Sequence, residues 1–456
     1  MKKYLEEIKV LTMITIPIML AQISQISMGL VNSTMVKSLN NTDIAAMSIG
    51  ISIWYPIILF GHGLLLSLVP TISYMNGSGK KYEIPNQIIN AYWLATIISI
   101  IIMIILWNAH YIINIANEIN PVIEKKSINY IRILLWSTPG YLYFQVIQNQ
   151  CEGFFKPKPA MIVGLMGLIL NILINYLLIY TKILPSNFKN IGCACSMTIV
   201  YWFMFFLMKI ITKYDYSINN VYYTKSYKYL PNFKIIWNLS TIGLPIALSI
   251  FFEVALFTLI TLLIASLNIT QIIAHQIVLN ISSFIFILPL SIGTATSIRI
   301  GFYLGQKNFN KISTIIISAQ TIGLILSTTI SIFIVLFCND IITLYTTDSN
   351  VIKRAREIML IAATYQIFDF FQIIGNGILR SYKDTHMIFI ITCISYWILG
   401  FPIGYLLALT DTIVPKLGAT GFWIGIFISL VASSLMTLCR ILSLQTIFTK
   451  HQKHNI

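Results

Sequence analysis

Long apolar stretches alternate with short polar segments along the whole chain. Twelve apolar spans are predicted, near residues 11–36, 44–72, 87–108, 128–150, 159–180, 191–212, 238–265, 272–298, 312–337, 356–378, 386–409 and 418–446. A helix of about 20 residues, at 1.5 Å rise per residue, crosses a hydrocarbon core of roughly 30 Å. The pattern therefore predicts an all-α integral membrane protein with twelve transmembrane helices.

One longer polar segment divides these spans into two sets of six. It runs from Lys213 to Lys234, between the sixth and seventh spans. We expect an N-terminal six-helix bundle over residues 1–212, a cytoplasmic connecting loop over 213–237 and a C-terminal six-helix bundle over 238–456.

The two halves are also related in sequence. One constant shift places Pro17 on Pro245 and the segment 38–44 on 266–272. Each half has six spans and begins on the same side, so the bundles are predicted to be parallel repeats related by an axis along the membrane normal. Transporters built in this way bind their substrate between the bundles and expose it to each side in turn.

Charge supports a membrane protein and gives it an orientation. Of the chain's residues, 57% are hydrophobic and 10% charged, whereas soluble domains have about 25% charged residues. The net charge of +15 comes from Lys and Arg scattered over short loops, so it does not predict a nucleic-acid surface. Of the 30 Lys and Arg residues, 20 fall on the side that holds both termini, which the positive-inside rule makes cytoplasmic.

Motifs that carry enzyme chemistry are absent from the sequence. It contains no HExxH, no GxxxxGK[ST] and no GxSxG. We therefore expect no enzyme activity and no cofactor. Uphill transport would then draw its energy from an ion gradient.

Glu253 is the main candidate for a functional residue. It lies in the middle of the apolar stretch Gly243 to Ile264. Insertion scales assign an ionised acid at that depth about 2.5 to 3.5 kcal/mol, so such a residue faces a protein interior or a water-filled cavity and is functional by default. In the first half, the repeat places the neutral Gln25 at the same position.

Asp369 is the other acid well inside an apolar span. Tyr365 precedes it by one helical turn and Gln372 follows it by three residues, so all three side chains can share a helix face. Glu253 and Asp369 together can bind a cation such as Na⁺ or hold a proton. Alternatively, each acid is neutral and hydrogen-bonded to its neighbours. A slightly shorter shift, which places Met161 on Met387, pairs Asp369 with Tyr143 of the first half.

Other polar residues inside the spans are Asn32, the pair Asn171 and Asn175 one turn apart, and His275. The three amides can line a cleft for substrate, or they can form hydrogen bonds between packed helices. His275 can relay protons, or it can join helices through a hydrogen bond.

Several long motifs resemble those of a known family. They include FFEVALF at 251–257, PLSIGTATSIRIGFYLG at 289–305, YQIFD at 365–369 and LRSYKD at 379–384. With others in the same order, they make the chain similar to the NorM-like branch of the multidrug and toxic compound extrusion (MATE) family, almost from end to end.

The resemblance implies a two-lobed antiporter of the bacterial inner membrane, most simply a monomer. It would export cationic, amphiphilic small molecules, such as drugs or dyes, in exchange for Na⁺ or H⁺. Glu253, Tyr365 and Asp369 match the family's cation site in the second lobe. The family usually has Asp in a VDTxM stretch where this chain has Asn32, and an amide cannot ionise. Ion coupling is therefore expected to depend on the second lobe.

Two other functions remain open from sequence. One is a flippase for a lipid-linked oligosaccharide or polysaccharide, as in other members of the superfamily. A basic cleft would favour it, but the residues at membrane depth include two acids and no clear basic cluster. The other is an integral membrane enzyme, which would need clustered catalytic residues or a sizeable extramembrane loop.

Overall fold

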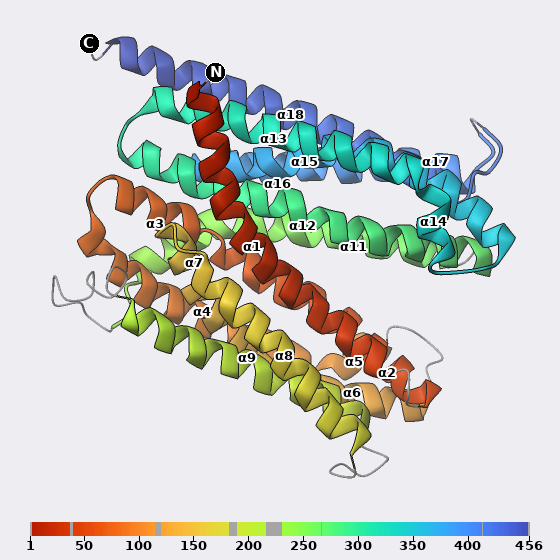
Figure 1. Cartoon of the computed structure of the whole chain (residues 1–456). Coiled ribbons are helices and arrows are strands. Elements are labelled where there is room, and N and C mark those ends of the chain that lie inside the picture. The colour runs from red at the N-terminus through yellow and green to blue at the C-terminus, as the bar shows by residue number, and fades with distance from the viewer. Residues whose placement is uncertain are drawn as a thin grey trace. The chain divides into compact units, whose positions relative to one another are not determined.

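The computed structural model describes residues 2–36, 40–114, 120–181, 189–215, 230–265, 267–412 and 414–454. Every regular element in these ranges is a helix (Figure 1). Residues 216–229 of the predicted connecting loop lie outside them, as do parts of the repeat segments 38–44 and 266–272. The all-α prediction is confirmed.

The first half contains long helices and several short helical segments. They are α1 (Lys2–Met35), α2 (Asn41–Leu65), α3 (Leu68–Gly77), η2 (Lys81–Glu83), α4 (Ile84–Trp107), α5 (Ala109–Asn114), α6 (Pro121–Leu134), α7 (Ser137–Gly153), α8 (Lys158–Tyr180) and α9 (Lys189–Tyr214).

The second half has fewer and longer helices, and one π-helical segment, η4, in its fifth span. They are α11 (Phe233–Ala265), α12 (Ile269–Gly305), α13 (Phe309–Leu336), α14 (Cys338–Thr343), α15 (Ser349–Ser381), α16 (Thr385–Thr392), η4 (Cys393–Gly400), α17 (Phe401–Leu409) and α18 (Ala419–His454).

Within the described ranges, 11 helical segments are long and apolar enough to cross a membrane. The predicted span 128–150 is not one of them. It is divided between α6 and α7, and its second half carries the buried amides Gln145, Gln148, Asn149 and Gln150. Several helices also begin before their apolar span: α1 starts at Lys2 and α15 at Ser349, since polar residues continue the helical hydrogen bonding beyond the apolar region.

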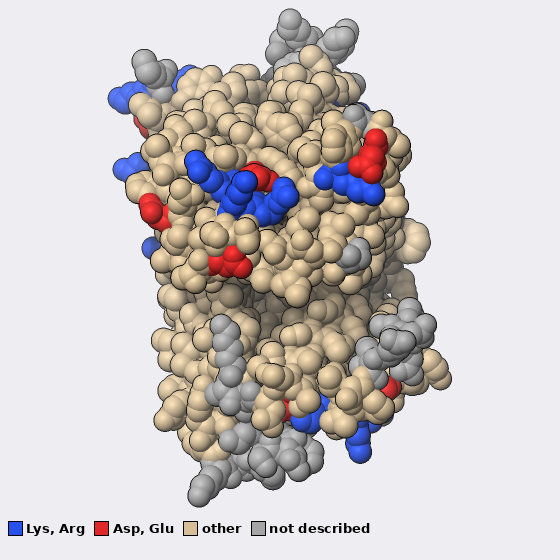
Figure 2. Space-filling view, turned by 90° about the vertical axis from the view of Figure 1, so that its right-hand side faces the viewer, with Lys and Arg blue, Asp and Glu red and all other residues tan. Residues whose placement is uncertain are grey.

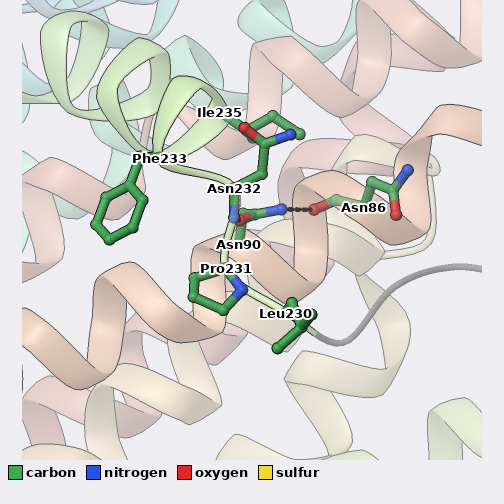
Figure 3. A pocket seen from close by; sticks show the side chains of 7 residues that line it. All are labelled: Asn86, Asn90, Leu230, Pro231, Asn232, Phe233 and Ile235. Carbon is green, nitrogen blue, oxygen red and sulfur yellow. Dashed lines mark hydrogen bonds between the residues drawn. The ribbon is translucent and has the colours of Figure 1, made fainter.

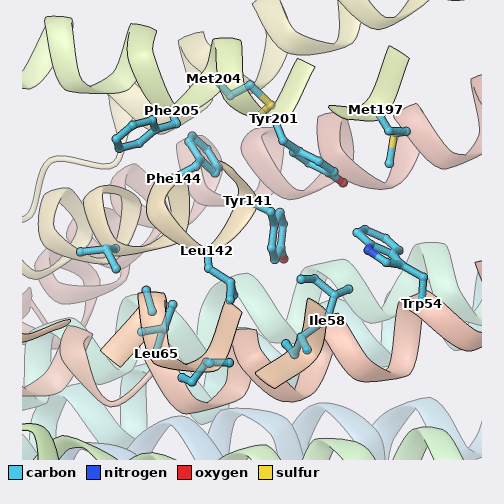
Figure 4. Close-up of a cluster of buried hydrophobic side chains, with 14 of the residues drawn as sticks. Trp54, Ile58, Leu65, Tyr141, Leu142, Phe144, Met197, Tyr201, Met204 and Phe205 are labelled. Atoms are coloured by element: carbon cyan, nitrogen blue, oxygen red, sulfur yellow. The ribbon is translucent and has the colours of Figure 1, made fainter. Parts of the chain in front are cut away.

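The described chain forms two compact units. The first unit is Ile16–Ala247, and the second unit is Met1–Thr15 together with Leu248–Ile456. Each contains a buried apolar cluster of its own. In the first unit, Trp54 and Ile58 of α2 face Tyr141 of α7 and Tyr201 of α9 (Figure 4). The predicted bundle limits at 212 and 238 stay a prediction.

The backbone carries the repeat between the halves. Gly79 and Lys307 both have positive φ (77° and 56°), as do Phe155 and Lys383 (63° and 58°). Both pairs have the spacing that separates Pro17 from Pro245, and each follows a matching helix, so one register holds through these turns.

This register changes one predicted correspondence. It makes Tyr141 the first-half counterpart of Asp369, and the predicted pairing with Tyr143 is wrong. The shorter shift, which pairs Met161 with Met387, begins only after the turns at Phe155 and Lys383, so it does not hold at Asp369.

Close packing between α12 and α15 depends on two glycines. A Cβ on Gly377 would overlap the backbone carbonyl of Gly293. One turn away, the Ser381 hydroxyl donates to the Ser297 carbonyl at 3.0 Å. Small residues of this kind let helices approach closely where lipid supplies no hydrophobic drive for association.

Charged side chains are sparse at the surface. On the face shown in Figure 2 they form a few separate groups, and most of that surface carries no charge. This distribution fits a chain whose outer surface contacts lipid over most of its area.

Candidate functional site

Four helical elements of the second unit bring the candidate site together. Glu253 lies on α11, Tyr365 and Asp369 on α15, and Tyr396 on η4, while α18 supplies Trp423 behind them. The side chains of Tyr365 and Asp369 are each 5% exposed, and Glu253 is half-buried. The structure thus gathers the three residues predicted for the cation site in one place.

Glu253 is held by a short hydrogen-bonded chain. The Tyr396 hydroxyl donates to Glu253 Oε1 at 3.4 Å, and Gln372 Nε2 donates to the Tyr396 hydroxyl at 3.1 Å. Tyr396 has one hydroxyl proton, and with these directions each group donates once along the chain. The same hydroxyl lies 3.2 Å from Gln372 Oε1, so its single proton can be donated either to Glu253 or to Gln372.

The π-helical segment places Tyr396 for this role. Two further bonds join the same region to α11: Ser249 to Thr392 at 2.8 Å between hydroxyls, and Trp397 Nε1 to the Phe252 carbonyl at 3.2 Å. π-Helical turns are rare and frequent at functional sites. Here the turn sets the side chains of η4 against the turn of α11 that carries Glu253.

The two acids share one electrostatic environment. Glu253 and Asp369 interact electrostatically with each other, and Tyr365 interacts with both. In the described part of the chain, neither acid forms an ion pair with Lys, Arg or His. A buried carboxylate without a counter-charge is costly, so this arrangement favours a proton or a bound cation at the acids.

The oxygen atoms around the acids are suitable ligands for a hard cation. Two carboxyl groups, two tyrosine hydroxyls and the Gln372 carbonyl supply oxygen only, which is the ligand type that such cations prefer. No group of three His, Cys, Asp or Glu that could hold a metal occurs among the described residues. Na⁺ at this site would therefore rely on two acids and on neutral oxygens.

His275 supports the site without reaching the acids. Its Nδ1 accepts from Trp423 Nε1 at 3.0 Å, and its Nε2 lies 2.9 Å from the Thr261 hydroxyl. Trp423 in turn stacks on Tyr365, with ring centroids 5.9 Å apart. Because Nδ1 accepts, the neutral ring carries its proton on Nε2 and donates to Thr261. His275 therefore joins α11, α12 and α18, which is the second of its two predicted roles.

In the first unit, the predicted amides form a buried cluster. Asn175 Nδ2 donates to Asn32 Oδ1 at 2.7 Å, and Asn171 Nδ2 donates to the Ser196 hydroxyl at 3.2 Å. All four residues are at most 2% exposed. The side-chain oxygens of Asn171 and Asn175 have no hydrogen-bond partner among the described residues, so the cluster joins helices but leaves two acceptors free there.

Gln25 belongs to a second polar network that the sequence did not reveal. Gln145 Nε2 donates to Gln25 Oε1 at 3.5 Å, Gln25 Nε2 to Gln148 Oε1 at 3.3 Å, and Gln148 Nε2 to Glu152 Oε1 at 2.8 Å. Glu152 is 3% exposed. Hydropathy does not single out Glu152, because it follows the end of an apolar span. Its spacing of four and seven residues from Gln148 and Gln145 does indicate that the three side chains share a helix face.

The repeat positions show where the units differ. Glu253 and Asp369 correspond to Gln25 and Tyr141, and the Tyr141 hydroxyl lies 3.1 Å from His62 Nδ1. The second unit thus has a pair of acids where the first has an amide and a tyrosine. The charge needed for cation binding is confined to the second unit at these positions.

A pocket of about 480 Å³ in the first unit, lined by three asparagines and four apolar residues, contains none of these residues (Figure 3). There Asn90 Oδ1 accepts from the Asn232 backbone N–H at 2.6 Å, and Asn90 Nδ2 donates to the Asn86 carbonyl at 2.7 Å. These bonds fix the chain where it enters α11, so the pocket has a structural explanation.

Comparisons with known proteins agree with the motifs. The MatE family model matches residues 17–177 and again 245–406, so its two matches begin at the prolines that the repeat pairs. Probable multidrug resistance protein NorM of Buchnera aphidicola subsp. Baizongia pistaciae (strain Bp) is 66% identical over 449 residues, or 98% of this chain and 100% of that protein. Multidrug resistance protein MdtK of Yersinia pseudotuberculosis serotype O:1b (strain IP 31758) is 42% identical over 445 residues, or 98% and 97%.

The crystal structure of the eukaryotic MATE transporter AtDTX14 is similar with a TM-score of 0.88 and 17% identity, and the match covers 100% of both chains. That likeness shows the fold, twelve helices in two bundles. Because the family model covers both halves and the relatives match over nearly the full length, the chain belongs to the MATE family.

Proposed function

We propose that this chain is a multidrug efflux antiporter that exports cationic, amphiphilic small molecules in exchange for Na⁺ or H⁺. One observation carries the proposal: Glu253 and Asp369 lie together at membrane depth in the second unit, and no described basic side chain neutralises them. The names of the two relatives, both multidrug resistance proteins, support the substrate class.

Coupling follows from competition for the two acids. A cation or proton that enters from outside binds at Glu253 and Asp369. It neutralises the negative charge that a bound cationic drug would otherwise neutralise, so the ion and the drug compete. Tyr396 and Tyr365 supply neutral oxygens to the bound ion. Binding favours the outward-facing arrangement, in which the drug leaves, and release of the ion to the cytoplasm resets the cycle.

The first unit contributes polarity but no charge at its amide cluster. Asn32, Asn171 and Asn175 are neutral at any physiological pH, so a proton cannot be stored there. Their free acceptors can instead bind water or a hydrogen-bonding group of a substrate. We therefore assign ion coupling to Glu253 and Asp369 of the second unit.

The remaining features follow the family. We place the protein in the bacterial inner membrane as a monomer, with both termini in the cytoplasm, as the distribution of Lys and Arg favours. Transport requires no bond-making step, no cofactor beyond the coupling ion and no nucleic acid.

The test is transport by the purified protein in lipid vesicles. An imposed Na⁺ or pH gradient should drive efflux of the fluorescent cation ethidium. Glu253→Gln and Asp369→Asn should each abolish the dependence on the gradient. Glu357→Gln is the matched control, because Glu357 is a surface acid of the same unit, 2.7 Å from Arg354. Gradient-driven efflux that persists in both site variants would overturn the assignment of the site.

A further inference from the structure

A shallow groove of about 440 Å³ lies between α16 and α18 of the second unit, apart from the candidate site. Met387 and Ile391 of α16 and Leu435 and Met436 of α18 form its apolar walls. Arg440 and Ser443 line the part nearer the C-terminal end of α18. The groove is thus apolar over most of its length, with a cationic group toward one end.

Arg440 is oriented by one partner and keeps hydrogen-bonding capacity. Its Nε donates to Asp384 Oδ2 at 2.6 Å, and the side chains of Arg440 and Asp384 are 34% and 17% exposed. Its two terminal NH₂ groups form no hydrogen bond with any described residue. A guanidinium held in this way can offer those two groups to a second anion.

The pair lies at the expected level of lipid headgroups. Asp384 directly precedes the span that starts at Thr385, and Arg440 is seven residues before the end of the span that closes at Ile447. The span Ala419–Ile447 has 29 residues, which at 1.5 Å per residue is longer than a hydrocarbon core of roughly 30 Å. Arg440, about 10 Å before the end of this span, can therefore lie near the boundary of the headgroup region. The apolar walls of the groove lie deeper, because Ile391 and Leu435 are farther along their helices from that end.

Other basic residues occupy the same end of the second unit. The Ser381–Ser297 bond joins the end of α15, which carries Arg380, to α12, which carries Arg299. Arg299 forms an ion pair with Glu7 at 2.7 Å, and Lys383 follows the end of α15. Charge distribution predicts this end to be cytoplasmic. Basic pockets between membrane helices on the cytoplasmic side suit the headgroups of anionic lipids.

We propose that this groove binds an anionic phospholipid of the cytoplasmic leaflet. One acyl chain lies along the apolar walls between α16 and α18, and the phosphate accepts from the terminal NH₂ groups of Arg440. A free phosphate would leave the apolar walls uncovered, and a zwitterionic lipid would gain less from Arg440, because its own ammonium group offsets the charge of its phosphate. The occupant that matches both parts of the groove is therefore an anionic lipid.

Cys439 provides a reporter in the groove itself. It lines the groove and is exposed, whereas Cys195 and Cys393 are partly exposed elsewhere and serve as internal controls. The full-length protein in detergent is treated with N-ethylmaleimide, and alkylation of each cysteine is followed by peptide mass spectrometry. Phosphatidylglycerol, phosphatidylcholine with the same chains, or inorganic phosphate is added in separate samples.

Phosphatidylglycerol should slow alkylation of Cys439 about fivefold relative to phosphatidylcholine, because one basic residue near an anionic headgroup contributes an effect of this size. The alkylation rates of Cys195 and Cys393 should not change. Arg440→Gln should remove this difference. Arg354→Gln, which breaks a different Arg–acid pair of the same unit (2.7 Å, with Glu357), should retain it. If Arg440→Gln does not fold because Asp384 loses its partner, the double variant Asp384→Asn/Arg440→Gln removes both charges and should give the same loss.

Three results would overturn the proposal. Equal protection by the two lipids would show that charge is not recognised. Protection by inorganic phosphate alone would assign the site to a free anion. Lipid selectivity that survives in the Arg440 variants would place the recognition elsewhere.

Discussion

The Tyr396 hydroxyl donates a hydrogen bond to the Glu253 carboxylate over 3.4 Å, from a π-helical turn that faces α11. This bond links the element that carries Tyr396 to the charge state of the candidate site. A cation that binds Glu253 must either share the carboxylate with Tyr396 or replace it. The tyrosine is therefore expected to affect transport although it carries no charge itself.

Tyr396→Phe should lower the rate of ion-driven ethidium efflux about fivefold to tenfold, the effect of one hydrogen bond worth roughly 1 to 1.4 kcal/mol. The ring is fully buried and Phe fills nearly the same volume, so the variant should fold. Tyr405→Phe, on a 42% exposed tyrosine of the same span, is the control. Equal rates in the two variants would show that Tyr396 only packs.

Thr261→Val should destabilise the protein by about 1 to 3 kcal/mol, because it leaves the buried Nε2–H of His275 without an acceptor. The measurement is the midpoint of thermal unfolding in detergent. Thr258→Val is matched, since Thr258 is exposed and donates only to the Val254 carbonyl one turn before it. A midpoint that falls equally in both variants would argue against a structural bond at His275.

Gly377→Ala should reduce stability by about 1 to 3 kcal/mol, because the added methyl group overlaps the Gly293 carbonyl and forces α12 and α15 apart. Gly29→Ala adds the same group at a position where nothing lies within 4 Å, so it should be neutral or slightly stabilising. The yield of monodisperse protein and its thermal midpoint measure both effects. A Gly377→Ala protein as stable as the Gly29→Ala protein would contradict the close contact.

Asn32→Asp should make transport depend more steeply on Na⁺ concentration. The new carboxylate would stand within hydrogen-bonding distance of Asn175 Nδ2, beside the unpartnered oxygens of Asn171 and Asn175, and would complete a second set of oxygen ligands. Initial rates of ethidium efflux across a series of Na⁺ gradients give the steepness. Asn32→Gln alters the same site without adding charge and should not increase this steepness. An unchanged dependence on Na⁺ in both variants would mean that this site of the first unit takes no part in ion coupling.

The sequence was sufficient for the fold and for the acids. An acid in a long apolar run is rare, so Glu253 and Asp369 stood out without a structure, and the family motifs placed Tyr365 beside them. Gln372 was expected on the same helix face as Asp369, but Tyr396 did not stand out, because tyrosines are common in such spans. Only the π-helical turn of η4 makes Tyr396 a partner of Glu253, and side-chain periodicity does not reveal a π-helix.

Two other features are only weakly marked in the sequence. Glu152 follows the end of the predicted span 128–150, where hydropathy does not single it out, whereas the structure buries it in a chain of glutamines. The partner of Asp369 in the first half was misplaced, at Tyr143 instead of Tyr141. Sequence similarity was thin there, and the positive-φ turns at Phe155 and Lys383 fix the register.

The central claim is that Glu253 and Asp369 carry the coupling ion. Its most direct test is entry of Na⁺ or H⁺ into vesicles stimulated by outward movement of ethidium, with each ion followed by its own indicator. The protein should show ethidium-stimulated entry of one of the two ions, and the double variant Glu253→Gln/Asp369→Asn should show none while it remains folded. Stimulated ion entry at the original rate in the double variant would contradict the claim.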